Sequence, residues 1–228
     1  MRDKLKKIFT AAALMLALGC VTELTGYSWF DEEDGSNAMC DLDPTCRNLT
    51  PKEIDLAKEF FGSSVDYKHV KVFSRNFFFY PFEGAAMVPN GNIYMLDDRM
   101  RNRTFDGSPD KDTGIFIHEM THVWQHQQGV SLPLSALAAY IENGFDYAAC
   151  YEYCVDKYAK FDDYNIEQQA SIVENIYNMR YVTKPEDIAS DSDYCTALRK
   201  HEEKAAQDLP LKPTKACRIK KSQQVPLI

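Results

Sequence analysis

The run His118-Glu119-Met120-Thr121-His122 is an HExxH motif, the most chemically informative stretch of this chain. Two histidines four positions apart lie on one face of a helix, so both imidazoles can reach the same metal ion. A catalytic zinc site takes three protein ligands and leaves the fourth position to water. Glu119 stands beside the first histidine, where its carboxylate can accept a proton from that water. The motif therefore predicts a zinc hydrolase, most often a peptidase.

The third ligand must come from outside the motif. His126 continues the spacing of four, but eight helical residues rise roughly 12 Å, whereas ligand nitrogens must lie within about 2.1 Å of one zinc. The run after His122 also lacks the glycine and histidine of the metzincin extension. We therefore expect His126 to be a polar wall residue or to face solvent.

Two glutamates compete for the third position. Glu142 follows the motif by twenty positions and precedes Asp146, a spacing that resembles the thermolysin-like arrangement of a glutamate ligand and an orienting aspartate. Asn143-Gly144 interrupts that helix, and a helical glycine costs about 1 kcal/mol relative to alanine. Glu167 lies in the segment Tyr164 to Tyr177, whose apolar residues recur at the spacing of a packed helix. These residues by themselves leave the choice open.

The HExxH motif needs a helix, and the flanking residues supply its start and stop. Asp110 and Asp112 can cap and charge a helix N-terminus, and Gly129 is a typical C-terminal stop. We expect a helix from Thr113 to Gln128. Apolar residues flank both histidines, which favours a metal site over a surface helix with incidental histidines.

Three blocks of the chain resemble a bacterial family: MVPNGNIY at 87–94, FIHEMTHVWQ at 116–125 and DYNIEQQA at 163–170. They are similar to the zincin-like metallopeptidase domains of Rhs- and Vgr-related proteins, over roughly Val65 to Tyr181. The resemblance implies an α+β, zincin-like fold with a small β-sheet, the HExxH helix and further helices. Because the EQQA block belongs to the family pattern, the resemblance assigns the third ligand to Glu167 and leaves Glu142 as runner-up.

Strands are predicted over 68–73, 75–80 and 91–96, which are rich in β-branched and aromatic residues. Zincins lay an edge strand beside the active-site helix, where an extended peptide can add by main-chain hydrogen bonds. Asn92-Ile93-Tyr94 is the candidate for that strand. The alternative is that Ile93 and Tyr94 are ordinary sheet residues that pack against the helix.

Further site residues follow from the proposed chemistry. Glu174 lies on the same helical stripe as Glu167 and is a candidate to orient a ligand histidine. An oxyanion donor is required, and Tyr177 and His126 are the candidates.

The N-terminus resembles an export signal. A basic start precedes Ile8 to Leu18, an apolar run too short to span a bilayer, which needs about 20 residues. The run closes on Ala17-Leu18-Gly19-Cys20, which resembles a lipobox and predicts Cys20 as the lipidation site, with an ordinary secretory signal as the alternative. Val21 and Thr22 lack the aspartate of inner-membrane retention, so an outer-membrane anchor is expected in the cell envelope.

Cysteine usage agrees with export. Setting Cys20 aside leaves an even number, which suggests disulfides in an oxidising compartment. Cys40 and Cys46 flank a short loop and could pair locally. Cys150 and Cys154 lie one helical turn apart and could each pair with Cys195 or Cys217, and a structural zinc on the first two is the competing interpretation.

Four segments are expected: a signal peptide of probable-lipoprotein type at 1–19, an acidic tether at 20–50, a zincin-like catalytic domain at 51–185 and a disulfide-stapled segment at 186–228. The net charge of -8 argues against nucleic acid as a partner. The expected substrate is a peptide or protein, the expected cofactor is Zn²⁺, and membrane contact is expected through the lipid. A secretion-system association is left open.

Taken together, these features predict a zinc metallopeptidase of the bacterial cell envelope. The alternative is a zincin-derived zinc-binding lipoprotein without turnover. Retention of Glu119 favours the enzyme, because a purely structural site has no need of a base.

Overall fold

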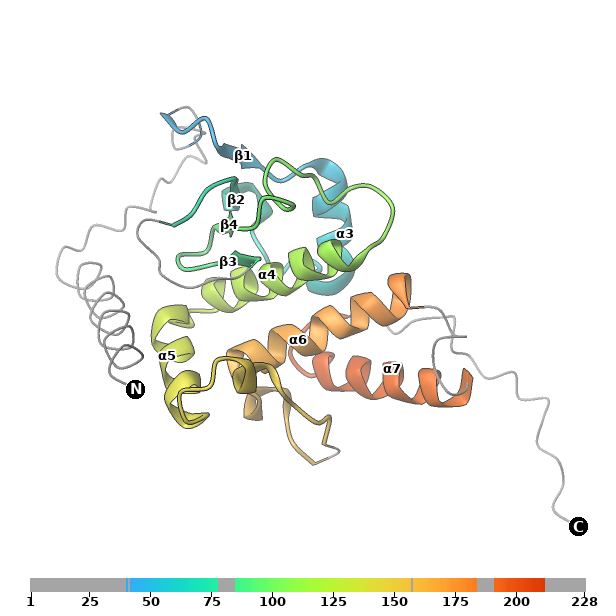
Figure 1. Cartoon of the computed structure of the whole chain (residues 1–228). Helices are drawn as coiled ribbons and strands as arrows, with labels where there is room; N and C mark the ends of the chain where they lie inside the picture. Colours follow the sequence, from blue (N-terminus) through green and yellow to red (C-terminus); the bar gives the residue numbers. More distant parts are fainter. Residues whose placement is uncertain (1–39, 41, 78–84, 157, 184–190, 212–228) are drawn as a thin grey trace, which may run out of the picture.

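A computed structural model describes residues 40, 42–77, 85–156, 158–183 and 191–211, without the side chains of 191–195. The described chain has mixed α+β architecture, with a small sheet on one side and helices on the other (Figure 1). The long helix α4, Lys111–Gln127, runs between the sheet and a layer formed by α6 and α7 (Figure 1). The expected α+β class with a small sheet is therefore confirmed.

The sheet has four short strands in the order β1-β2-β4-β3. β1 (Cys46–Asn48) pairs antiparallel with β2 (Lys71–Phe73), β2 pairs parallel with β4 (Ile93–Met95), and β3 (Ala86–Met87) pairs antiparallel with β4. All residues of β2 and β4 are buried, and Val72, Phe73, Ile93 and Tyr94 are the β-branched and aromatic types that favour strands.

Three strand predictions need correction. The candidate edge strand Asn92-Ile93-Tyr94 is wrong, because β4 is paired on both sides and the edges of the described sheet are β1 and β3. Ile93 joins the main core together with residues of α4, as the alternative interpretation held, whereas Tyr94 stacks on Phe73 in a second, smaller cluster. The strand predicted at 68–73 is shorter, since 67–69 form the 3-10 helix η1. Residues 75–77 of the predicted strand 75–80 are irregular, and 78–80 lie outside the described residues.

The central helix α4 has the boundaries that the sequence predicts to within two residues. Asp110 is the N-cap, and its carboxylate accepts from the backbone N–H of Thr113 at 2.9 Å. Arg103 pairs with both Asp110 and Asp112 and so fixes the helix start. Gly129 follows with φ of +87°, a conformation that glycine adopts without strain. The helix is buried on most of its circumference, so it is a core element with neighbours on several sides.

The other helices surround α4. Helix α3 is Pro51–Phe61, α5 is Leu132–Glu142, α6 is Ile166–Tyr177 and α7 is Asp191–Ala205. Short 3-10 turns, η2 (Ala148–Tyr151) and η3 (Phe161–Asp163), connect α5 to α6, and the π-helical segment η4 (Asn178–Val182) follows α6. The apolar residues predicted to pack α6 are all buried: Ile166, Ala170, Val173 and Tyr177.

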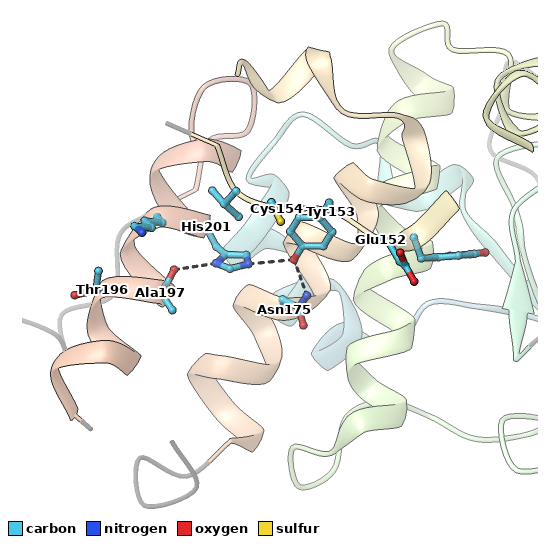
Figure 2. A pocket seen from close by; sticks show the side chains of 10 residues that line it. Glu152, Tyr153, Cys154, Asn175, Thr196, Ala197 and His201 are labelled. Atoms are coloured by element: carbon cyan, nitrogen blue, oxygen red, sulfur yellow. Dashed lines mark hydrogen bonds between the residues drawn. The ribbon is translucent and has the colours of Figure 1, made fainter. Parts of the chain in front are cut away.

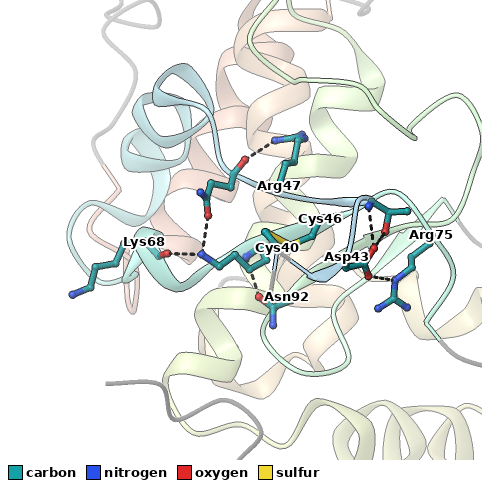
Figure 3. Close-up of a disulfide and its surroundings, with 10 residues drawn as sticks. Cys40, Asp43, Cys46, Arg47, Lys68, Arg75 and Asn92 are labelled. Carbon is teal, nitrogen blue, oxygen red and sulfur yellow. Dashed lines mark hydrogen bonds and ion pairs between the residues drawn. A yellow bond between two sulfur atoms is a disulfide. The ribbon is translucent and has the colours of Figure 1, made fainter. Parts of the chain in front are cut away.

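The segment before α3 belongs to the folded domain (Figure 3). The predicted pair Cys40–Cys46 forms a disulfide, Asp43 pairs with Arg75, and Arg47 makes a two-point ion pair with the fully buried Glu53. The end of the expected tether at 20–50 is therefore part of the sheet, because β1 pairs with β2 and adds to its backbone hydrogen bonding.

The C-terminal segment also contributes to the core. Leu198 and Ala205 of α7, and Leu209 and Leu211 after it, are buried in the main hydrophobic cluster. Cys150 is buried and Cys154 is exposed, and neither forms a disulfide within the described part of the chain. Their predicted partners, the Cys195 side chain and Cys217, lie outside the described residues, as do the signal peptide at 1–19 and Cys20. No helix among the described residues has the length and apolar character needed to cross a bilayer.

Candidate metal centre

Three predicted ligands come together in the interior. The ligand atoms of His118, His122 and Glu167 all lie within 4.8 Å of one another. Glu167 Oε2 is 3.3 Å from His118 Nε2 and 3.1 Å from His122 Nε2. The two imidazole nitrogens and the carboxylate oxygen therefore converge on one point, and two imidazoles with one glutamate is a known donor set of catalytic zinc.

The helix α6 holds Glu167 in its first turn. Asn165 is the N-cap, and its side-chain oxygen accepts from the backbone N–H groups of Glu167 and Gln168, each at 2.9 Å. Gln168 Oε1 in turn accepts from the backbone N–H of Asn165 at 3.1 Å, which completes a capping box. The backbone that carries Glu167 is thus fixed by local hydrogen bonds before any metal is considered.

The two ligand histidines have different partners behind them. His118 Nδ1 lies 3.1 Å from Glu174 Oε2, so the predicted orienting role of Glu174 agrees with the geometry. His122 Nδ1 lies 2.8 Å from Gln125 Oε1, a partner that sequence reasoning missed. The only sequence sign of Gln125 is its position three residues after His122 on the same helix. Both partners leave Nε2 of each ring facing the cluster.

Charge in the cluster suits a cation. Burial disfavours the charged form of His118, but its hydrogen bonds to Glu167 and Glu174 outweigh burial and raise the pKa of His118 to about 10. The pKa of His122 is also raised, because the carboxylate of Glu167 outweighs the burial that opposes it. Burial would raise the pKa of Glu167, but the two histidines lower it overall. A divalent cation can replace the protons that these groups would otherwise hold.

Glu119 is the expected base of the site. It is 5% exposed, and its Oε2 has no hydrogen-bond partner among the described residues. A buried carboxylate oxygen without a partner is unusual and needs an explanation, such as an ion or water at the site. Burial raises the pKa of Glu119 above its ordinary value. The donor set and this unpartnered oxygen together fit a metal ion with a bound solvent molecule.

Other predicted site residues lie elsewhere. Glu142 is the exposed last residue of α5 and is outside the ligand cluster. His126 is half-buried against the backbone of Gly91, as expected of a wall residue. Tyr177 is in the core, with its hydroxyl at Thr113 near the start of α4. Neither Tyr177 nor His126 is therefore brought to the cluster as an oxyanion donor.

A pair of tyrosines that the sequence did not single out borders the cluster instead. The ring of Tyr151 stacks beside His118, with 5.9 Å between ring centroids. The Tyr151 hydroxyl donates to that of Tyr147 at 2.6 Å. Burial, and then the charge of Glu167, raise the pKa of Tyr151 well above its usual value, and burial raises that of Tyr147 to about 12. Both hydroxyls thus keep their protons at neutral pH, and the Tyr151 proton is directed at the Tyr147 oxygen.

A separate pocket lies on the α7 side of Tyr151 (Figure 2). Tyr153, Asn175 and His201 form a closed network there: Asn175 donates to the Tyr153 hydroxyl at 2.6 Å, and His201 Nε2 lies 3.0 Å from that hydroxyl. His201 Nδ1 contacts the Ala197 carbonyl at 2.8 Å. None of the clustered ligands lines this pocket, so it is separate from the His118, His122 and Glu167 cluster.

Known proteins resemble this chain. Over 134 residues it is 39% identical to the type VI secretion system spike protein VgrG2b of Pseudomonas aeruginosa. That stretch is 58% of this chain and 13% of the spike protein. The solved effector domain of P. aeruginosa VgrG2b matches with a TM-score of 0.59 and 28% identity, over 91% of this chain and 99% of that domain. No family model matches the chain. The Vgr-related part of the expected resemblance is therefore supported.

Proposed function

We propose that this protein is a zinc-dependent metallopeptidase of the bacterial cell envelope. The observation that carries the proposal is the convergence of His118, His122 and Glu167 beside a buried Glu119 oxygen that has no partner. A metal site with no catalytic duty would have no use for that carboxylate.

Each residue of the site has a role in this reaction. His118, His122 and Glu167 would hold the zinc ion. When bound, zinc would polarise the scissile carbonyl and lower the pKa of a water molecule. The Glu119 carboxylate would accept the water proton as the water attacks, and would then deliver it to the leaving amine. The Tyr147 hydroxyl, which accepts the Tyr151 proton beside His118, would donate to the developing oxyanion.

The ligand count favours catalysis over a structural site. Structural zinc is almost always held by four protein ligands, whereas catalytic zinc keeps one position open. The cluster in the described residues has three members. The alternative of a zinc-binding lipoprotein without turnover is the second outcome of the test below.

The location and partners are part of the proposal. The Cys40–Cys46 disulfide supports a place outside the reducing cytoplasm. Similarity to a type VI secretion system spike protein agrees with export and makes secretion-system association the partner class to test. We assign the substrate to peptides or proteins, and Cys20 to lipid anchoring at the outer membrane.

The test compares wild type with Glu119→Gln in the exported domain. Gln keeps the size of the side chain but cannot accept the water proton, so hydrolysis of an unfolded protein substrate should fall about 100-fold or more while bound zinc is unchanged. Glu142→Gln, on the exposed end of α5, is the matched control and should behave as wild type. Zinc-loaded wild type without hydrolysis of any peptide or protein substrate would instead support the non-catalytic lipoprotein.

A further inference from the structure

A chain of buried amide groups lies directly behind the ligand His122. It runs from Gln125 on α4 to Gln169 on α6, and both side chains are buried. Gln125 Nε2 donates to Gln169 Oε1 at 2.9 Å and to the Ile166 carbonyl at 3.1 Å. Gln169 Nε2 in turn donates to the carbonyls of Phe161 and Tyr164, at 3.3 Å and 2.9 Å. The chain thus joins the entry loop of α6 to the ring of His122.

The direction of the hydrogen bonds in this amide chain is fixed at its Gln169 end. Backbone carbonyls only accept hydrogen bonds, so the amide nitrogen of Gln169 must face Phe161 and Tyr164. Its oxygen therefore faces Gln125 and accepts from the Gln125 amide nitrogen. The Gln125 amide nitrogen also donates to the Ile166 carbonyl, and this hydrogen bond requires the same orientation of the Gln125 amide. Both amide orientations follow from these carbonyl partners.

The orientation of Gln125 determines the protonation of His122. With its nitrogen committed to Gln169 and Ile166, Gln125 can offer only Oε1 to the ring, at 2.8 Å from Nδ1. An oxygen acceptor requires a proton on Nδ1. In the neutral ring, Nε2 then carries the lone pair, and Nε2 is the nitrogen that faces Glu167 and the cluster.

We propose that Gln125 and Gln169 are positioning residues of the metal centre that set the His122 tautomer and hold its Nε2 toward the metal. Gln169 lies two positions after the ligand Glu167, and Gln125 lies three after the ligand His122. The amide chain therefore also joins the two ligand-bearing helices at the level of the site. This inference rests on the proposed metal centre and adds two residues that do not touch the ion.

The two histidines are consequently held by different chemistry. His118 has the carboxylate of Glu174 behind it, whose second oxygen accepts from Asn178 Nδ2 at 3.4 Å. His122 has a neutral amide instead. Either oxygen of a carboxylate can accept a hydrogen bond, whereas an amide accepts only through its oxygen and donates only through its nitrogen. The His122 arrangement therefore depends on hydrogen-bond polarity that begins at the carbonyls of the α6 entry loop.

The test measures zinc affinity by chelator competition in wild type, Gln125→Met and Gln169→Met. Methionine keeps similar volume and loses every amide hydrogen bond. Gln125→Met should weaken zinc binding about 10- to 100-fold, the usual effect of losing an outer partner of a ligand histidine. Gln169→Met should weaken it less, because the Ile166 carbonyl still orients Gln125. Thr121→Val is the matched control: it removes one buried hydrogen bond from α4, to the Ile117 carbonyl, and leaves the amide chain intact.

A second readout separates positioning from a loss of packing. Nitrogen-15 spectra of the zinc-loaded protein should show a slowly exchanging proton on Nδ1 of His122 in wild type and in Thr121→Val. Exchange of that proton should be faster in both glutamine variants. A proton on Nε2 of His122 in wild type would overturn this inference and leave the proposed function standing. Zinc affinities of both glutamine variants equal to that of Thr121→Val would have the same consequence. Wild type that binds no zinc would overturn the proposed function together with it.

Discussion

Glutamate occurs in four different settings around the HExxH helix, and the surroundings decide what each can do. Glu167 lies between two imidazoles, Glu174 lies behind one of them, and Glu119 is buried without a partner for Oε2. Glu142 is exposed at the end of α5. Sequence spacing could not rank Glu142 and Glu167, because it carries no information on which helix packs against α4.

Glu174 offers a prediction at the residue scale. Glu174→Ala should weaken zinc binding about 10- to 100-fold, because His118 loses the group that holds its Nδ1. Glu174→Gln keeps an oxygen acceptor without the charge, so its zinc affinity should lie between those of Glu174→Ala and wild type. Chelator competition measures both, with Glu203→Ala on the exposed face of α7 as control. Equal affinities in all these variants would remove Glu174 from the centre.

At the scale of elements, the turn before β4 lies close against helix α4. Gly91 has φ of +80°, and a Cβ on it would lie 2.4 Å from Cδ2 of the His126 ring. The glycine therefore meets two demands: a left-handed backbone and a close approach to α4. This contact explains His126 as a residue that packs the sheet against the helix.

Gly91→Ala should lower the free energy of unfolding by about 2–5 kcal/mol, the sum of about 1–2 for the left-handed backbone and about 1–3 for overpacking. In a His126→Ala background the overpacking disappears, so the same change should cost only about 1–2 kcal/mol. Urea unfolding of the four proteins of this cycle measures the difference. An equal cost in both backgrounds would mean that Gly91 and His126 do not make this contact.

At the scale of the whole molecule, the candidate metal centre is a product of tertiary packing. The sequence predicted α4 well, because its cap, apolar pattern and glycine stop are all local signals. It also predicted the burial of one face of α6 and the local Cys40–Cys46 disulfide. Each of these depends on residues close together in the chain.

Features that depend on distant residues were predicted less well. Asn92-Ile93-Tyr94 was predicted at the sheet edge, but the strand order places it inside the sheet. This prediction failed because the sequence of a single strand does not specify its pairing partners. The contacts of Gln169 with Gln125 and of Tyr151 with His118 were missed for the same reason, because in each case the partner lies on another element. The assignment of Glu167 required the family resemblance, and the packing of α6 on α4 then brought it to the histidines.

The central claim is that α4 and α6 together build one zinc site, and zinc content tests it most directly. Elemental analysis would be made on the purified exported domain as wild type, Glu167→Ala and Glu142→Ala. We expect about one zinc per chain in wild type and in Glu142→Ala, and loss of zinc in Glu167→Ala, because three protein ligands are required. Zinc retained in Glu167→Ala and lost in Glu142→Ala, or absent from folded wild type after reconstitution, would contradict the account.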